Sequence, residues 1–105
     1  MKTIENKTEF DNLIAQSKPI LLDFYADWCG PCQSLLPTVE KLAEVYEGKI
    51  EIQKVNVDQN SELASKFGVR SIPALFFLKD KEIVDRSAGN LPEAVLRGKL
   101  EALLN

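Results

Sequence analysis

The sequence contains no histidine, and this absence excludes two common kinds of site. A cysteine nucleophile paired with a histidine base cannot form within one chain. Zinc sites that combine cysteine with histidine ligands are excluded for the same reason. Cysteine is almost as scarce, because Cys29 and Cys32 are the only two. One chain therefore cannot supply four cysteine ligands to a zinc ion.

An excess of positive charge is also missing. The chain has 13 basic and 16 acidic residues, a net charge of -3, and no run of basic residues. This balance argues against a general nucleic-acid-binding protein. No stretch is apolar and long enough to span a membrane, and residues 1–10 lack the apolar core of a signal peptide. We therefore expect a soluble, cytoplasmic protein that binds neither nucleic acid nor membrane.

The length and composition are sufficient for one folded unit. A chain of 105 residues, 45% of them hydrophobic, corresponds to a single domain spanning residues 1–105. A chain of this size buries roughly 65% of the surface that it exposes when unfolded. Permanent structural disulfides are rare in the cytoplasm. A close cysteine pair there is expected to perform redox chemistry or to bind a metal.

The hydrophobic spacing predicts strands that alternate with helices. Strands are expected at Thr3-Ile4 and at 20–25, 50–57, 74–78 and 82–88; helices are expected at 8–17, from the cysteine motif to about 47, and at 61–67 and 92–104. Thr8 is the expected N-cap of the first helix. The inward side chains expected on the last helix are Val95, Leu96, Leu100, Leu103 and Leu104.

The order of these elements predicts a fold class. Alternating strands and helices imply parallel βαβ units, and the last two strands imply an antiparallel hairpin through Asp80-Lys81. We expect an α/β fold, a three-layer α/β/α sandwich in which four helices flank a mixed central sheet of four to five strands.

The segment Trp28-Cys29-Gly30-Pro31-Cys32 follows the first central strand directly. If a helix begins here, positions three apart lie on one face and the two thiols meet. Pro31 suits the first helical turn, since its missing N–H is not needed there. Cys29 would lie at the helix N-terminus, where the unpaired N–H groups and the dipole favour a thiolate.

Other uses of the cysteine pair are weaker. Half a zinc site would need ligands from a second chain or from carboxylates. An inert disulfide over so short a loop constrains the unfolded chain little. Covalent haem attachment requires a histidine after the second cysteine, and this chain has Gln33. The spacing and the preceding strand favour a redox-active dithiol.

Two further residues stand out beside apolar strands. Asp23 lies within an apolar strand, where burial raises the pKa of a carboxyl and makes Asp23 a candidate proton acceptor for Cys32. An exposed strand end or a structural salt bridge remains an alternative for Asp23. Lys54 is its natural partner if the two strands are neighbours. Pro73 must stand at the first residue of its strand, because proline cannot donate to the sheet.

Several segments of the chain resemble the thioredoxin family. The similarity extends over nearly the whole chain, and Trp-Cys-Gly-Pro-Cys followed later by Ile-Pro is a specific combination. The segments that carry the resemblance are 23–32, Pro37, 54–58, 69–73 and Gly89. Gln33 and Ala74 depart from the family pattern, in which a basic residue and a threonine are common at these places.

This resemblance implies a protein disulfide reductase that acts by thiol–disulfide exchange. Cys29 would attack a disulfide of a client protein, and Cys32 would resolve the mixed disulfide. Asp23, assisted by Lys54, would take part in proton transfer, and Pro73 matches the cis-proline of the family. The expected client-binding surface comprises, with Pro73, the residues Trp28, Gly30, Pro31, Val57, Ile72 and Gly89.

The same resemblance implies the partners. An NADPH-dependent, flavin-containing thioredoxin reductase would recharge the cysteine pair. The chain itself would carry no cofactor and no metal, and it would act as a monomer. Two alternatives remain at this point. The chain could be a binding or chaperone-like subunit whose redox state is incidental, or an oxidase or isomerase of disulfides in an oxidising compartment.

Overall fold

A mixed sheet of five strands forms the middle layer of the structure, a computed structural model that describes residues 1–105. The strands lie in the order β1-β3-β2-β4-β5. β3 pairs in parallel with β1 and β2, whereas β4 is antiparallel to both β2 and β5. The strand bounds are Lys2–Thr3 for β1, Ile20–Tyr25 for β2, Glu51–Asn56 for β3, Ala74–Lys79 for β4 and Glu82–Ala88 for β5.

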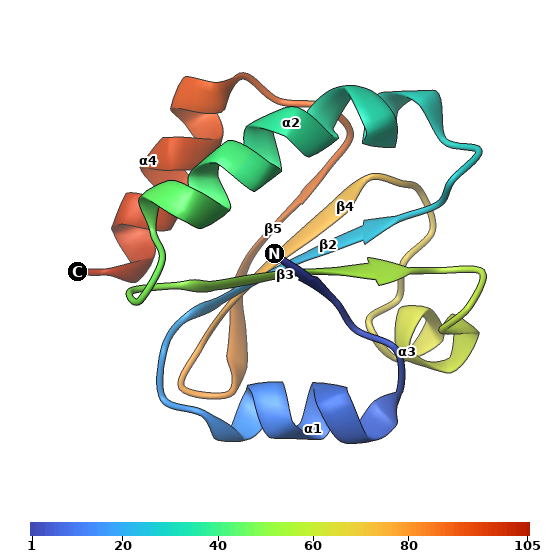
Figure 1. Cartoon of the computed structure of the whole chain (residues 1–105), viewed down its shortest axis with the longest axis horizontal. Coiled ribbons are helices and arrows are strands. Elements are labelled where there is room, and N and C mark those ends of the chain that lie inside the picture. The colour runs from blue at the N-terminus through green and yellow to red at the C-terminus, as the bar shows by residue number, and fades with distance from the viewer.

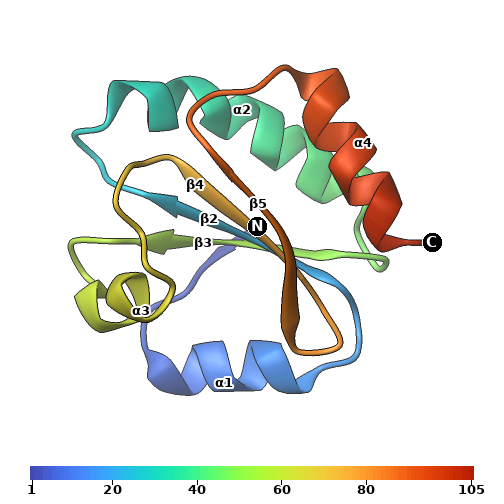
Figure 2. The ribbon, with the colours of Figure 1, turned by 180° about the vertical axis from the view of Figure 1, so that it is seen from behind.

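Two pairs of helices cover the two faces of this sheet. The bounds are Lys7–Ala15 for α1, Gly30–Val45 for α2, Ser61–Lys66 for α3 and Glu93–Leu103 for α4. Figures 1 and 2 show α2 and α4 on one face and α1 and α3 on the other. The predicted α/β/α sandwich with four helices is therefore confirmed, with five strands in the sheet.

Each face of the sheet has its own buried core. β2 and β4 are buried along nearly their whole length, as expected for strands that are covered on both sides. Successive side chains of a strand point to opposite faces. Thus Leu22 and Phe24 belong to the core beneath α1 and α3, while Leu21 belongs to the core beneath α2 and α4.

The sheet topology brings three chain segments to one end of the molecule. β2 and β3 are parallel, so the loop after Tyr25 and the turn after Asn56 start at the same end of the sheet, where these two strands finish. β4 is antiparallel to β2, and it therefore begins at that same end of the sheet with Ala74, directly after Pro73. The cysteine motif follows β2 at this convergence of three segments.

The first helix begins earlier than the sequence predicts. Thr8 is not the N-cap, because Asn6 occupies that position and its side chain accepts a hydrogen bond from the N–H of Glu9. The side chain of Glu9 in turn accepts from the N–H of Glu5 at 2.9 Å. This reciprocal arrangement satisfies two backbone donors that Thr8 could not reach from inside the helix.

The predicted core is wrong for two residues at the last helix. Val95 and Leu104 are 47% and 39% exposed, whereas Leu96, Leu100 and Leu103 are buried. The buried positions lie four and three residues apart and form one narrow stripe toward the sheet. None of the helices is long and apolar enough to cross a membrane.

Candidate active site

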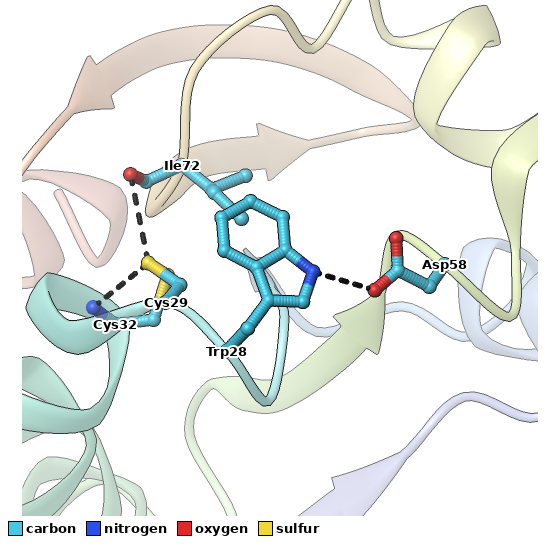
Figure 3. The surroundings of a disulfide bond; sticks show 5 residues. All are labelled: Trp28, Cys29, Cys32, Asp58 and Ile72. Atoms are coloured by element: carbon cyan, nitrogen blue, oxygen red, sulfur yellow. Dashed lines mark hydrogen bonds between the residues drawn. A yellow bond between two sulfur atoms is a disulfide. The ribbon is translucent and has the colours of Figure 1, made fainter.

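The two cysteines form a disulfide at the first turn of α2. Their Cα atoms lie 5.3 Å apart, and Cys29 is the N-cap of the helix. The Sγ atom of Cys29 accepts a hydrogen bond from the N–H of Cys32 at 3.1 Å (Figure 3). Pro31 lies in the first turn, where its missing N–H leaves no donor unpaired. The predicted helix start and the predicted meeting of the two sulfurs are both confirmed.

The surroundings of Cys29 favour a negative charge on its sulfur. The first turn of α2 contains no acidic residue, and the free N–H groups of the helix point toward the N-cap. Cys29 and Cys32 are only 4% and 3% exposed, and with Ala26 they form a small buried cluster. A disulfide of another molecule can therefore reach these sulfur atoms only along the surface that leads to this cluster.

The segment before β4 forms one wall of the site. Ile72 packs against the cysteine cluster, and its carbonyl oxygen lies 3.8 Å from Sγ of Cys29 (Figure 3). The Ile72–Pro73 peptide bond is cis, a conformation that the resemblance implied and that base rates alone do not predict. The carbonyl oxygen of Pro73 accepts a hydrogen bond from the N–H of Gly89 at 2.8 Å. Gly89 has a φ of +82°, which favours glycine.

Trp28 presents an aromatic surface beside the disulfide. The side chain is 72% exposed, yet its Nε1 donates a hydrogen bond to Oδ2 of Asp58 at 2.8 Å. Figure 3 shows the Nε1 edge of the indole turned toward Asp58 and away from Cys29. The buried amide of Asn56 fixes this turn, because its Oδ1 accepts from the N–H groups of Asp58 and Gln59.

Asp58 was not among the site residues predicted from the sequence. It belongs to the segment 54–58 that carries the resemblance, but a polar residue after a strand is ordinary in a turn. Only the fold brings its carboxylate to Trp28, which is 30 residues away along the chain.

Asp23 is buried in the middle of β2. The residue is 2% exposed, and its Oδ1 has no hydrogen-bond partner. Burial raises the pKa of this carboxyl from its ordinary value of 3.8 to about 7, and the positive charge of Lys54 opposes the rise. The alternative of an exposed strand end is therefore wrong, and no ion pair with Asp23 is formed. A carboxyl of this pKa can both take up and release a proton near neutrality.

Lys54 lies directly opposite Asp23 in the parallel register of β2 and β3. The predicted neighbourhood of these two residues is confirmed. Their charged atoms, however, do not form an ion pair within 4.0 Å. The Nζ atom of Lys54 lies instead over the ring of Tyr25, 5.2 Å from the ring centroid.

The structure gathers most of the remaining predicted residues around the cysteines. Val57 and Ile72 pack on the cysteine cluster, and Gly30 and Pro31 are exposed on the first turn of α2. No group of three or more cysteine and carboxylate side chains is arranged to hold a metal ion. The chemistry available here is that of two sulfur atoms beside an apolar, partly exposed surface.

Comparison with known proteins identifies one family over nearly the whole chain. A sequence model of the thioredoxin family matches residues 2–102. Thioredoxin 1 of Nostoc sp. is 41% identical over 98 residues, which cover 93% of this chain and 92% of the relative. The thioredoxin of Haemophilus influenzae is 44% identical over 92 residues, covering 87% of this chain and 86% of that protein.

A solved structure is similar as well. The X-ray structure of Fasciola hepatica thioredoxin has a TM-score of 0.89 and 38% sequence identity, and the match covers 97% of this chain and 98% of that chain. The close pair of cysteines at the start of α2 supplies the redox-active group that such proteins use. The chain therefore belongs to the thioredoxin family and is a thiol–disulfide oxidoreductase.

Proposed function

We propose that the protein reduces disulfides in client proteins, with Cys29 as the nucleophile. The supporting observation is the position of Cys29 at the N-cap of α2, where its sulfur accepts the N–H of Cys32. The same hydrogen bond stabilises a thiolate in the reduced protein. Cys32 is the third residue of the helix and does not occupy the N-cap position.

The reaction then proceeds in two exchanges. The Cys29 thiolate attacks one sulfur of the client disulfide; that bond breaks, and the other client sulfur leaves as a thiolate and takes up a proton. The Cys32 thiolate next attacks Sγ of Cys29 and releases the second client sulfur. Two electrons pass to the client, and the disulfide between Cys29 and Cys32 is the product on this chain.

Asp23 is proposed to accept the proton of the Cys32 thiol. Its pKa of about 7 allows both protonation states at neutral pH, and β2 leads directly into the cysteine loop. Lys54 assists by placing a positive charge near the carboxyl. The proposed client surface comprises the exposed indole of Trp28 and the neighbouring Gly30, Pro31, Val57, Ile72, Pro73 and Gly89.

We further propose that an NADPH-dependent thioredoxin reductase regenerates the dithiol. This direction of electron flow requires surroundings that keep thiols reduced, so the cytoplasm is the proposed location. Residues 1–105 are proposed to fold as one domain, because both buried cores lie against one sheet. The proposed state is a monomer, and it is supported by the edge strand β5, where the side chain of Asp85 accepts a hydrogen bond from the N–H of Arg86.

The test is the reduction of insulin with dithiothreitol as the electron source. Cys29→Ser is expected to abolish turnover, and Cys32→Ser is expected to trap mixed disulfides with clients. Full activity of Cys29→Ser contradicts the mechanism. A variant with both cysteines replaced by serine, if it still rescues a deletion strain completely, would instead identify a binding or chaperone-like role.

A further inference from the structure

Three side chains share one face of the sheet beneath α2. Asp23 and Lys54 are register partners on β2 and β3, and Tyr25 follows Asp23 by two residues on the same strand. Side chains two residues apart on a strand point to the same face. Tyr25 thus lies between Asp23 and the cysteine cluster, and it packs against that cluster.

The amino group of Lys54 has two possible partners on this face. It can approach the Asp23 carboxyl beside it, or it can lie over the ring of Tyr25. The structure shows the second arrangement, with Nζ 5.2 Å from the ring centroid and no ion pair to Asp23. A cation within about 6 Å of an aromatic face is attracted by the ring quadrupole.

Other charged groups near Asp23 do not compete with Lys54. On β4 the register partner of Asp23 is the apolar Leu75. The buried face of α2 consists of Cys32, Leu35, Val39 and Leu42, while the charged residues of α2 (Glu40, Lys41 and Glu44) are exposed. The two half-buried cations of α4, Arg97 and Lys99, bind Glu93 and Asp85 respectively. Lys2 of β1 is exposed.

We infer that Tyr25 is a positioning residue, whose ring holds the ammonium group of Lys54 near the Asp23 carboxyl but out of ion-pair contact with it. The inference rests on the proposed proton transfer by Asp23. A direct ion pair would favour the carboxylate form and oppose its protonation. Held on the ring, Lys54 stabilises the carboxylate only partly, and Asp23 keeps its ability to exchange a proton near neutrality.

The experiment measures the pKa of Asp23 by the ¹³C NMR signal of its carboxyl carbon in the oxidised protein. It compares Tyr25→Leu with Tyr25→Phe, each with Lys54 and with Lys54→Gln. Tyr25→Leu with Lys54 present is expected to lower the pKa of Asp23 by about one pH unit, because the freed ammonium group pairs with the carboxylate. Tyr25→Phe keeps the ring and is expected to leave this pKa unchanged.

The Lys54→Gln background separates positioning from simple burial. In that background Tyr25→Leu is expected to have no effect on the pKa of Asp23. An equal fall in both backgrounds would mean that the ring acts by excluding water, and it would overturn the inference, as would the absence of any fall. Tyr25→Met replaces Tyr25→Leu if the latter does not fold.

A separate measurement tests the proposed proton transfer by Asp23, so that its failure can be told apart from the failure of this inference. Full insulin-reducing activity of Asp23→Asn at pH 6 to 8 would refute the catalytic role of Asp23 and leave the NMR result standing. If both roles hold, the pH profile of insulin reduction by Tyr25→Leu moves to lower pH by the shift measured for Asp23, whereas Tyr25→Phe retains the parent profile.

Discussion

The indole Nε1 of Trp28 and the carboxylate Oδ2 of Asp58 lie 2.8 Å apart, which fixes an aromatic side chain that is otherwise 72% exposed. A freely rotating side chain would lose conformational entropy each time a client bound. Asp58 removes part of that cost in advance, and it holds the ring beside the disulfide.

Replacing Asp58 by alanine is therefore expected to mobilise Trp28. Because Trp28 is the only tryptophan, its fluorescence anisotropy reports this change directly and should fall. The KM for insulin should rise about threefold, which corresponds to ~0.7 kcal/mol for a solvent-exposed hydrogen bond. kcat should be retained, since neither cysteine is altered.

Asp27→Ala is the matched control, because Asp27 is an exposed carboxylate next to Trp28 that makes no hydrogen bond to the indole. An equal loss of anisotropy in Asp27→Ala, or none in Asp58→Ala, would contradict this role of the hydrogen bond.

The burial of Asp23 predicts an unusual dependence of stability on pH. Below pH 3.8 the carboxyl is protonated in both the folded and the unfolded chain, and it has no effect. Between 3.8 and about 7 only the unfolded chain releases the proton, so the free energy of unfolding falls as the pH rises. Above about 7 both states are ionised, and the penalty is constant.

Asp23→Asn abolishes this dependence. The free energy of unfolding of the variant, relative to the parent, is expected to increase by about 4 kcal/mol between pH 4 and pH 8. Urea titration of the oxidised proteins measures it, and the cysteines then do not titrate. Asp27→Asn, a replacement of an exposed carboxylate in the loop that follows β2, controls for the change in net charge. A constant difference between Asp23→Asn and the parent across this range would show that Asp23 is not buried as described.

One substitution in the β4–β5 hairpin should stabilise the protein. Asp80 and Lys81 have φ values of +53° and +69°, in the left-handed region. Aspartate adopts this region more readily than lysine, for which the cost is roughly 1–2 kcal/mol. Lys81→Gly should therefore raise the free energy of unfolding by about 1 kcal/mol. Lys49→Gly is the control, since the φ of Lys49 is not positive and glycine there should be neutral or destabilising.

We expect Asp85 to protect the open edge of the sheet at β5. Its Oδ1 accepts from the N–H of Arg86 at 2.8 Å, and its Oδ2 binds Nζ of Lys99 at 2.8 Å. The register of the β4–β5 pairing also shifts between Phe77 and Leu78. This irregularity lies beside the exposed Val84 and makes the outer strand less regular, which disfavours pairing with another chain.

Asp85→Ala is expected to free the Arg86 N–H and to remove a charge from this edge. The variant should associate as its concentration rises, which sedimentation velocity detects. Lys99→Ala removes the ion pair but keeps the hydrogen bond to the Arg86 N–H, so it should remain monomeric. If Asp85→Ala stays monomeric at millimolar concentration, the register shift between Phe77 and Leu78 is enough to protect the strand without Asp85.

The fold could be predicted from the sequence where local pattern and burial agree. The apolar run of 20–25 and the carboxylate within it identified a central strand with a perturbed group, and β2 has the bounds predicted. The N-cap could not be assigned reliably, because Asn6 and Thr8 are both good capping residues two positions apart. Val95 was predicted to be in the core because it lies next to the apolar face of the helix, but the buried part of that face is narrower than the apolar pattern suggests.

The site required contacts that local sequence does not encode. Asp58 reaches Trp28 only through the parallel pairing that aligns the ends of β2 and β3. The placement of Lys54 over Tyr25 depends on a flexible side chain that chooses between two neighbours, and the identity of the residues alone does not decide it.

The two ends of the molecule are separated along its longest axis, which extends 33 Å. In Figure 1 the loop from β2 into α2 lies at one end and the C-terminus at the other, and Figure 2 shows the same separation from behind. Nζ of Lys79 binds the carbonyl oxygen of Asn105 at 2.7 Å and secures the C-terminal end. A tether attached after Asn105 would therefore immobilise the protein on a solid support with its disulfide directed outward, toward the solution.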